Sequence, residues 1–478
     1  MGRALVRHWL VFIVLAVAIA LRVVLTVAYR PAIIFPDSVG YLYGAQRAIT
    51  GEQRQGGYSL LIEPFLHLGP SLTVLTIVQH VLGVAVVVVM YAALLRNGVR
   101  PWLAALGVSP LALDAVPAYI EQFVMSDTFA NSLLLLGLAA LLRAGKTPSW
   151  WALGSAGVLF GCSASIRIAN LVAVLVAASF LLFVHRTRVR GLAAAGALTL
   201  AAAVPLAGYA ALYHQDHGRW ALTGDSSLMG YSRVSRIIDC GRLDLPDYER
   251  PLCPAQALGH RKAPDFYAWD VRSPAYHLKQ SSLPPDRTVE QVRTDFVQRV
   301  MWQERTAYAW SVFKNIGDLF PANRGDAFWA RRDRWLPTKA FPTFGFNPQP
   351  SVARFDNGRR VELHKDAAGV AYYYGRIVVT PGPLLGLLLI VALATGCGAG
   401  NREGRRLRIL LIALTGMGTL IISVASLYSS IRYQVLAAAL IPVAAALGIS
   451  SVLESRSPET SDATVGTERD ATASTTAY

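Results

Sequence analysis

Long apolar runs separated by short polar turns follow one another along most of the chain, and they predict helices that cross a membrane. The first run covers residues 9–29 and is interrupted by Arg22. A helix needs about 20 apolar residues to cross the hydrocarbon core of a bilayer. A cleaved signal peptide is the competing interpretation of this run. Because the run continues past Arg22 and no cleavage site follows it, we expect a first membrane helix.

Further apolar runs bring the predicted number of spans to about ten. The later runs are residues 71–95, 101–116, 127–142, two short runs within 150–184 that meet at Arg167, 189–213, 377–395, 407–428 and 433–453. With 53% hydrophobic and 16% charged residues, the chain has a mean hydropathy of +0.39, which excludes an ordinary soluble domain. The pattern predicts a polytopic, mainly α-helical membrane protein.

The polar stretches divide the chain into four parts. We expect a membrane core at residues 1–213, with its first loop at 29–70, an extracytoplasmic domain at 214–376, three closing spans at 377–453 and a tail at 454–478. The tail is rich in Ser, Thr and charged residues, so we expect it to be disordered.

The extracytoplasmic domain carries both helical and strand-like patterns. Residues 359–379 alternate and predict a β-hairpin that turns at 366–369. Residues 290–317 have helical periodicity instead. Their predicted apolar face consists of Val292, Phe296, Val300, Trp310 and Phe313. Together the two patterns predict a mixed α/β domain.

Basic residues decide which side of the membrane each turn faces. They gather in the turns at residues 96–100, 143–146, 185–190 and 401–408. Cytoplasmic loops carry an excess of Lys and Arg, so these turns and both termini are expected in the cytoplasm. The first loop and the large polar domain then lie outside the plasma membrane. We expect the net charge of +15 to reflect arginines placed in cytoplasmic loops such as these, and therefore expect no nucleic-acid partner.

Two cysteines of the polar domain predict a disulfide. Cys240 and Cys253 lie in the part of the chain that we expect outside the cell, where the compartment is oxidising. No Cys-X-X-Cys motif and no Cys/His cluster with zinc spacing occurs in the sequence.

Charged residues at the outer edge of the membrane are the candidates for chemistry. Ionisable groups at a membrane cost free energy, so each requires a partner or a function. These residues are Asp37, Glu121, Asp127, Arg167 and Arg432. The topology predicts that they share a side of the membrane, and we hypothesise that they share a site.

Each of these groups has a structural and a chemical interpretation. Asp37 and Asp127 stand where a turn or a helix N-cap would place them, yet a carboxylate at the membrane edge can also act as a base. Arg167 could form a structural ion pair and Arg432 could snorkel, yet guanidinium groups also match phosphate oxygens. Glu121 has no capping role, and it could serve as a second acid or hold a cation.

Five segments, taken in order, carry a resemblance to a known family. They are Phe35-Pro-Asp-Ser-Val-Gly-Tyr-Leu-Tyr43, Gly57-Tyr-Ser-Leu-Leu61, the acidic loop before Ser126-Asp-Thr128, Ser165-Ile-Arg167 and Arg432-Tyr433. The chain resembles the GT-C class of integral membrane glycosyltransferases, close to the dolichyl-phosphate-mannose-protein mannosyltransferase and aminoarabinose transferase branch. The resemblance covers residues 1–214 and, more weakly, the last three spans.

The resemblance implies a reaction and the residues that perform it. A sugar would pass from a polyprenyl phosphate, held in membrane lipid, to an acceptor hydroxyl on the outer face, usually with inversion. Asp37 would be the general base, and Arg167 and Arg432 would bind the donor phosphate. The acceptor would be a glycan, lipid or protein of the cell envelope.

The implied site has further members and one departure from the family. Glu121 or Asp127 would take a second acidic position. Many members carry an acid directly after the loop aspartate, where this chain has Ser38. A divalent cation, Mg²⁺ or Mn²⁺, is therefore an option and not an expectation. The side chains implied to line the sugar are Tyr41, Tyr58 and Tyr433.

Two other functions fit the same pattern. A transporter or a flippase of lipid-linked sugars would also carry ionisable residues in its spans. A non-catalytic scaffold would need only the outer domain and a partner. The tryptophans of that domain are candidates for core packing or for holding a glycan acceptor, namely Trp220, Trp269, Trp302, Trp310, Trp329 and Trp335.

Overall fold

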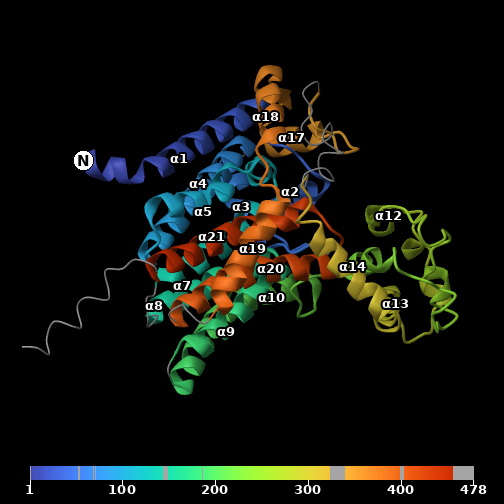
Figure 1. Ribbon diagram of the computed structural model, residues 1–478. Helices are drawn as coiled ribbons and strands as arrows, with labels where there is room; N and C mark the ends of the chain where they lie inside the picture. Colours follow the sequence, from blue (N-terminus) through green and yellow to red (C-terminus); the bar gives the residue numbers. More distant parts are fainter. Residues whose placement is uncertain are drawn as a thin grey trace, which may run out of the picture.

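The computed structural model describes residues 2–51, 54–67, 69, 71–143, 149–185, 187–322, 340–398 and 403–455. Within these residues the fold is mainly α-helical with almost no sheet, and the long helices lie side by side (Figure 1). A short antiparallel sheet pairs β1 (Tyr29–Arg30) with β2 (Glu362–Leu363). The prediction of a mainly α-helical chain is confirmed.

The helices follow one another with short connections in the first half of the chain. They are α1 (Gly2–Ala28), α2 (Pro36–Arg47), α3 (Gly57–His67), α4 (Leu72–Arg96), α5 (Pro101–Leu113), α6 (Ala115–Gln122), α7 (Asp127–Arg143), α8 (Trp150–Ile166), η1 (Ile168–Leu171), α9 (Val172–Val184) and α10 (Arg188–His217). The later helices are α11 (Ser227–Val234), η2 (Arg250–Leu252), α12 (Pro264–Trp269), η3 (Pro274–Tyr276), η4 (Gln280–Ser282), α13 (Val289–Gln303), α14 (Arg305–Gly317), α17 (Gln349–Phe355), α18 (Lys365–Ile377), α19 (Gly382–Cys397), α20 (Glu403–Ser426) and α21 (Ile431–Ser455).

Five helices in the described ranges are long and apolar enough to cross a membrane. They are Val6–Ala28 in α1, α4, α10, Gly404–Ser426 in α20 and Ile431–Glu454 in α21. The number rises to seven if two bent pairs each count as one span, α5 with α6 at 49° and α18 with α19 at 51°. The remaining predicted spans form α7, α8 and α9, whose 17, 17 and 13 residues fall short of about 20. The structure thus supports five to seven spans, where the pattern predicts ten.

Small residues let neighbouring helices approach closely in the bundle. α8 packs along α10, and a Cβ at Gly161 of α8 would lie 2.2 Å from the carbonyl oxygen of Ala202 in α10. Only glycine fits so close a crossing. Among the candidate spans α21 is the most buried, and it packs against α5, α19 and α20. It therefore runs through the interior of the bundle.

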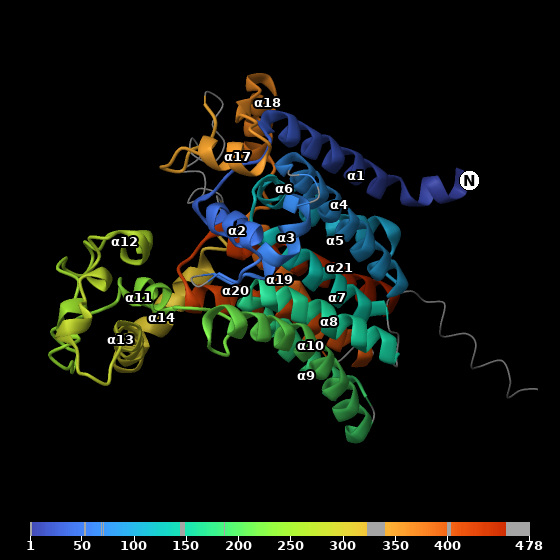
Figure 2. The same ribbon diagram turned by 180° about the vertical axis from the view of Figure 1, so that it is seen from behind.

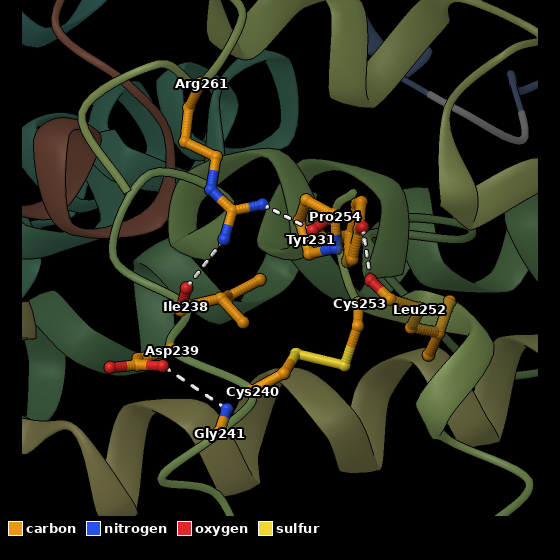
Figure 3. The surroundings of a disulfide bond; sticks show 9 residues. All are labelled: Tyr231, Ile238, Asp239, Cys240, Gly241, Leu252, Cys253, Pro254 and Arg261. Carbon is orange, nitrogen blue, oxygen red and sulfur yellow. Dashed lines mark hydrogen bonds between the residues drawn. A yellow bond between two sulfur atoms is a disulfide. The ribbon is translucent and has the colours of Figure 1, made fainter. Parts of the chain in front are cut away.

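Helices α11, α12 and α13 form a lobe to one side of the long helices (Figures 1 and 2). The lobe has an apolar core of its own, which includes Tyr231 and Phe296. A disulfide joins Cys240 to Cys253 beside this core (Figure 3). The Arg261 guanidinium donates to the carbonyl oxygens of residues 238 and 254, on both sides of the disulfide loop, at 3.0 and 2.8 Å. The disulfide and these hydrogen bonds together hold a segment that has little regular structure.

The prediction of a mixed α/β outer domain is wrong. In its described part the chain forms helices, and its strand β2 has two residues. The predicted hairpin at residues 359–379 is mostly α18, because the His364 side chain caps that helix and accepts from the N–H of Ala367. Ala368, Ala371 and Gly375 are buried, at the spacing of a helical face and not of a strand.

The predicted apolar face at residues 290–317 is correct only for its first half. The chain leaves the helix at Glu304, which separates α13 from α14. Trp310 and Phe313 of α14 are 66% and 64% exposed. The residues that do face the lobe core are Val292, Phe296 and Val300. Trp329, Trp335 and residues 456–478 of the predicted tail lie outside the described residues.

Candidate functional site

Asp37 lies in the first turn of α2, and another residue caps that helix. Phe35 occupies the extended N-cap position, and Pro36 fixes the first helical residue. The Oγ of Ser38 accepts a hydrogen bond from the backbone N–H of Phe35 at 2.9 Å. Ser38 thus does the work of a capping side chain, which leaves the Asp37 carboxylate for other partners.

Two arginines bind the Asp37 carboxylate. Nη2 of Arg54 lies 2.8 Å from Oδ1, and Nη1 of Arg432 lies 3.2 Å from Oδ2. Arg54 belongs to the first loop, and Arg432 is the second residue of α21. The Asp37 side chain keeps 15% of its surface exposed, so the carboxylate can still be reached from solvent.

Arg432 joins Asp37 to a second carboxylate, that of Asp127. Nη2 of Arg432 lies 2.8 Å from Oδ2 of Asp127, and Arg167 bonds the other oxygen, Oδ1. The Asp127 side chain is fully buried, and both of its oxygens serve ion pairs. We call Arg54, Asp37, Arg432, Asp127 and Arg167 the charged network. Four of the five predicted outer charges therefore meet, and Glu121 is the exception.

The charged network holds one guanidinium more than it has carboxylates. Three arginines and two aspartates give a net charge of +1 (three minus two). The Nε–H of Arg432 has no hydrogen-bond partner within the described part of the chain, although its side chain is only 12% exposed. A buried N–H without a partner costs free energy. The network is therefore suited to an anionic ligand at Arg432.

The position of Arg167 depends on the break between α8 and α9. The backbone is extended at Arg167 (φ −144°, ψ 110°), where α8 ends and η1 begins. Gln55 of the first loop hydrogen-bonds to backbone groups on both sides of this break. Gly57 permits the contact, because a Cβ there would lie 2.5 Å from the carbonyl oxygen of Ser165. The first loop thus holds the broken helix end that directs Arg167 toward Asp127.

The Tyr433 ring lies beside two of the guanidinium groups. Its centroid is 5.2 Å from Cζ of Arg167 and 5.9 Å from Cζ of Arg432. The Phe35 ring lies 5.8 Å from the same Arg432 carbon. Aromatic faces attract cations at these distances. The rings therefore hold the guanidinium planes without using their N–H groups.

Tyr41 and Tyr58 are buried next to the charged network. The Tyr41 hydroxyl lies 3.1 Å from Oγ of Ser126, and the two tyrosine rings meet edge to face at 5.0 Å. Tyr58 is fully buried, and its hydroxyl donates to Gln79 at 3.1 Å. Burial, and after it the charge of Asp37, raises the pKa of Tyr41. The Tyr41 hydroxyl therefore stays protonated at neutral pH.

Glu121 lies apart from the charged network, in a second group of buried ions. Arg22 binds it with two hydrogen bonds of 2.7 and 2.8 Å, and Nδ1 of His80 lies 2.9 Å from Oε2. All three side chains are buried. We call Arg22, Glu121 and His80 the inner cluster. The structure does not join Glu121 to the charged network, because α6 directs its side chain toward Arg22 of α1 and His80 of α4.

The sequence pattern does not single out Arg54 or Arg22 as partners of these acids. The available signal for Arg54 was a basic residue in a loop that the charge rule places outside. The signal for Arg22 was a charge within an apolar run. The guanidinium of Arg54 also lies over the Trp269 ring, with Cζ 4.9 Å from its centroid. The lobe therefore reaches the edge of the charged network through Trp269 of α12.

The charged network does not fit a divalent cation. Its carboxylates already bind three guanidinium groups, which would repel Mg²⁺ or Mn²⁺. Within the described ranges, no three His, Cys, Asp or Glu side chains gather in a way that could hold a metal ion. The guanidinium N–H groups of the network favour an anionic ligand instead.

No protein-family model matches this chain, and no curated protein matches it either. The resemblance to the GT-C class therefore stays a prediction. It rests on the order of the sequence segments named above.

Proposed function

We propose that the protein is an integral membrane glycosyltransferase of the GT-C type, which moves a sugar from a polyprenyl phosphate to an acceptor hydroxyl. The observation that carries the proposal is the charged network, in which Asp37 and Asp127 share Arg432. A carboxylate within reach of solvent, next to guanidinium groups, suits a reaction that removes a proton and releases a phosphate. The apolar helices beside the network offer the surroundings that a polyprenyl chain requires.

In the proposed reaction Asp37 is the general base. The acceptor oxygen attacks the anomeric carbon, and its proton passes to an oxygen of Asp37. The bond between the anomeric carbon and the phosphate oxygen breaks, and the anomeric configuration inverts. Arg432 and Arg167 stabilise the negative charge that grows on the leaving polyprenyl phosphate. Because the phosphate competes for Arg432, its binding releases one oxygen of Asp37 for the proton.

The remaining predicted residues take supporting roles in this proposal. Asp127 is the second acid, and it orients Arg167 and Arg432 through its two ion pairs. Tyr41 and Tyr433 line the sugar, whereas Tyr58, which the sequence also placed there, is fully buried and packs against the Tyr41 ring instead. The site faces the outside of the plasma membrane in this proposal, and both termini lie in the cytoplasm. The acceptor is a glycan, lipid or protein of the cell envelope.

Sugar transfer can be measured with the full-length protein in vesicles that contain a polyprenyl-phosphate sugar, with isolated cell envelope as the acceptor. Mannose, arabinose and aminoarabinose donors form the panel that the resemblance suggests. We expect one donor to be consumed, and Asp37→Asn to abolish transfer in a protein that is still folded. Asp247→Asn, at a carboxylate that is 99% exposed in the outer lobe, is the matched control and should keep full activity. Full activity of Asp37→Asn would remove this residue from the reaction.

A second candidate function is the transport or flipping of lipid-linked sugars, and the inner cluster favours it. Ionisable residues buried among apolar helices are typical of transporters. A flippase would lose its activity with Glu121→Gln and keep it with Asp37→Asn. Movement of a fluorescent polyprenyl-phosphate sugar across the bilayer of proteoliposomes distinguishes the two functions.

A further inference from the structure

Helix α14 (Arg305–Gly317) lies beside the end of α20 (Figure 1) and packs against it with one face. The Tyr308 hydroxyl donates to the carbonyl oxygen of Ala425, in the last turn of α20, at 2.9 Å. Val312 and Ile316 pack against an apolar cluster built from α19, α20 and α21. This packed face fixes α14 at the end of α20.

The opposite face of α14 exposes two large aromatic rings. Trp310 and Phe313 are 66% and 64% exposed, and their rings stack with centroids 5.6 Å apart. Lys314 is exposed as well, and it follows Trp310 by four residues, about one turn further along the same side of the helix. Aromatic rings flanked by cations are typical of helices that lie at the boundary between lipid and water. In water the same rings would leave a large apolar surface uncovered.

The exposed rings continue the apolar outer surface of a candidate span. Ile421 and Ile422 of α20 are 39% and 41% exposed, about one turn before Ala425. The span Gly404–Ser426 has 23 residues and is therefore about 34 Å long, close to the thickness of a hydrocarbon core. Its end beside α14 is where a lipid–water boundary is expected.

Another exposed tryptophan marks the other end of the same spans. The Ser450 hydroxyl, near the end of α21, donates to the carbonyl oxygen of Gly98 at 3.2 Å. Trp102 follows that turn and is 46% exposed. Exposed tryptophans thus stand near both ends of the apolar layer, as in the aromatic belts of membrane proteins.

We propose that α14 is an interfacial helix whose exposed face binds the outer surface of the lipid bilayer. Trp310 and Phe313 enter the boundary between headgroups and acyl chains, and the Lys314 ammonium group reaches lipid phosphates. Because α14 follows α13 directly, this contact ties the lobe to the membrane surface. It thereby keeps α12, with Trp269, next to Arg54.

Fluorescence quenching by brominated lipid tests this contact in the full-length protein, whatever its activity. The protein is reconstituted in phosphatidylcholine that is brominated near the headgroup end of one acyl chain, and in unbrominated lipid. The emission of Trp310 is the difference between the wild type and Trp310→Phe. We expect bromination to lower this difference at least about twofold. The matching difference for Trp269→Phe, over Arg54 in the lobe, should stay unchanged.

Equal emission of Trp310 in both lipids would overturn the proposal. A second copy of this chain is the competing occupant of the exposed face. It would be revealed by a disulfide between two copies of Phe313→Cys, in a background where Cys162 and Cys397 are replaced by Ser. That cross-link would assign the face to a protein contact and would equally overturn the proposal.

Discussion

Asp37 and Asp127 share a single guanidinium group, because Arg432 donates to Oδ2 of the first at 3.2 Å and to Oδ2 of the second at 2.8 Å. The shared arginine joins the first loop to α7 through the start of α21. A ligand that competes for Arg432 therefore acts on both carboxylates at once. This coupling leads to separate expectations for stability and for activity.

The stability of the protein should depend on Arg432. Arg432→Gln leaves the fully buried Asp127 with Arg167 as its remaining charged partner among the described residues. Breaking a buried ion pair in this way lowers the free energy of unfolding by about 3 kcal/mol. Thermal unfolding in detergent should show the loss. Arg250→Gln, in an exposed pair with Asp247, should change it by less than about 0.5 kcal/mol. Equal melting temperatures for the two variants would contradict the role of Arg432.

Arg54 should act on transfer more than on stability. Its side chain is 26% exposed, so Arg54→Gln should lower the free energy of unfolding by less than about 1 kcal/mol. Because Arg54 orients the Asp37 carboxylate, we expect kcat to fall at least about tenfold while KM for the donor stays near its original value. Arg287→Gln, in a partly exposed pair with Asp295, is the matched control. A large rise in KM with unchanged kcat would instead assign Arg54 to donor binding.

The inner cluster should behave as a coupled buried ion pair. Arg22→Met leaves Glu121 buried without its main cation, which should cost about 3–5 kcal/mol of stability. The double variant Arg22→Met with Glu121→Met removes both charges, and it should regain most of that loss. Chemical unfolding of the single and double variants measures the coupling. A double variant that is no more stable than the single one would show that the two charges are not coupled.

The close crossing of α8 and α10 should tolerate no side chain at Gly161. Gly161→Ala brings a Cβ into the carbonyl oxygen of Ala202, and we expect a loss of about 1–3 kcal/mol. Gly154 lies on the same helix with open space around it, so Gly154→Ala should be neutral or stabilising. Both variants add the same methyl group to the same helix. The difference between their melting temperatures therefore measures the packing at the two positions. Equal values would mean that the crossing is looser than described.

Sequence patterns predicted the helices well because apolar runs and basic turns act locally. The predicted topology also suggested the hypothesis that Asp37, Asp127, Arg167 and Arg432 share a site, and the structure brings these four side chains together. The pairing of Arg22 with Glu121 could not be predicted in this way. It depends on the rotation of α1 and α6 about their axes, which the length of an apolar run does not determine.

Residues 359–379 and 290–317 also differ from their predicted structure, and both differences have local causes. The alternation of apolar and polar residues at 359–379 resembles that of a strand. The cap at His364 and the small buried residues at helical spacing stabilise the helix α18 instead. The periodicity at residues 290–317 continues across Glu304, where the backbone leaves the helix. A break of one residue rotates the following helix, and it turns Trp310 and Phe313 away from the lobe core. Such a break leaves almost no trace in a hydrophobic pattern.

The most direct test of the central claim separates donor binding from transfer in Asp37→Asn. Binding of the active polyprenyl-phosphate sugar to the reconstituted full-length protein is measured alongside the rate of transfer in a single turnover. If Asp37 is the general base, the variant should bind the donor about as tightly as the wild type and transfer its sugar at least about 100-fold more slowly. Transfer at the rate of the wild type, with the donor bound, would contradict the account.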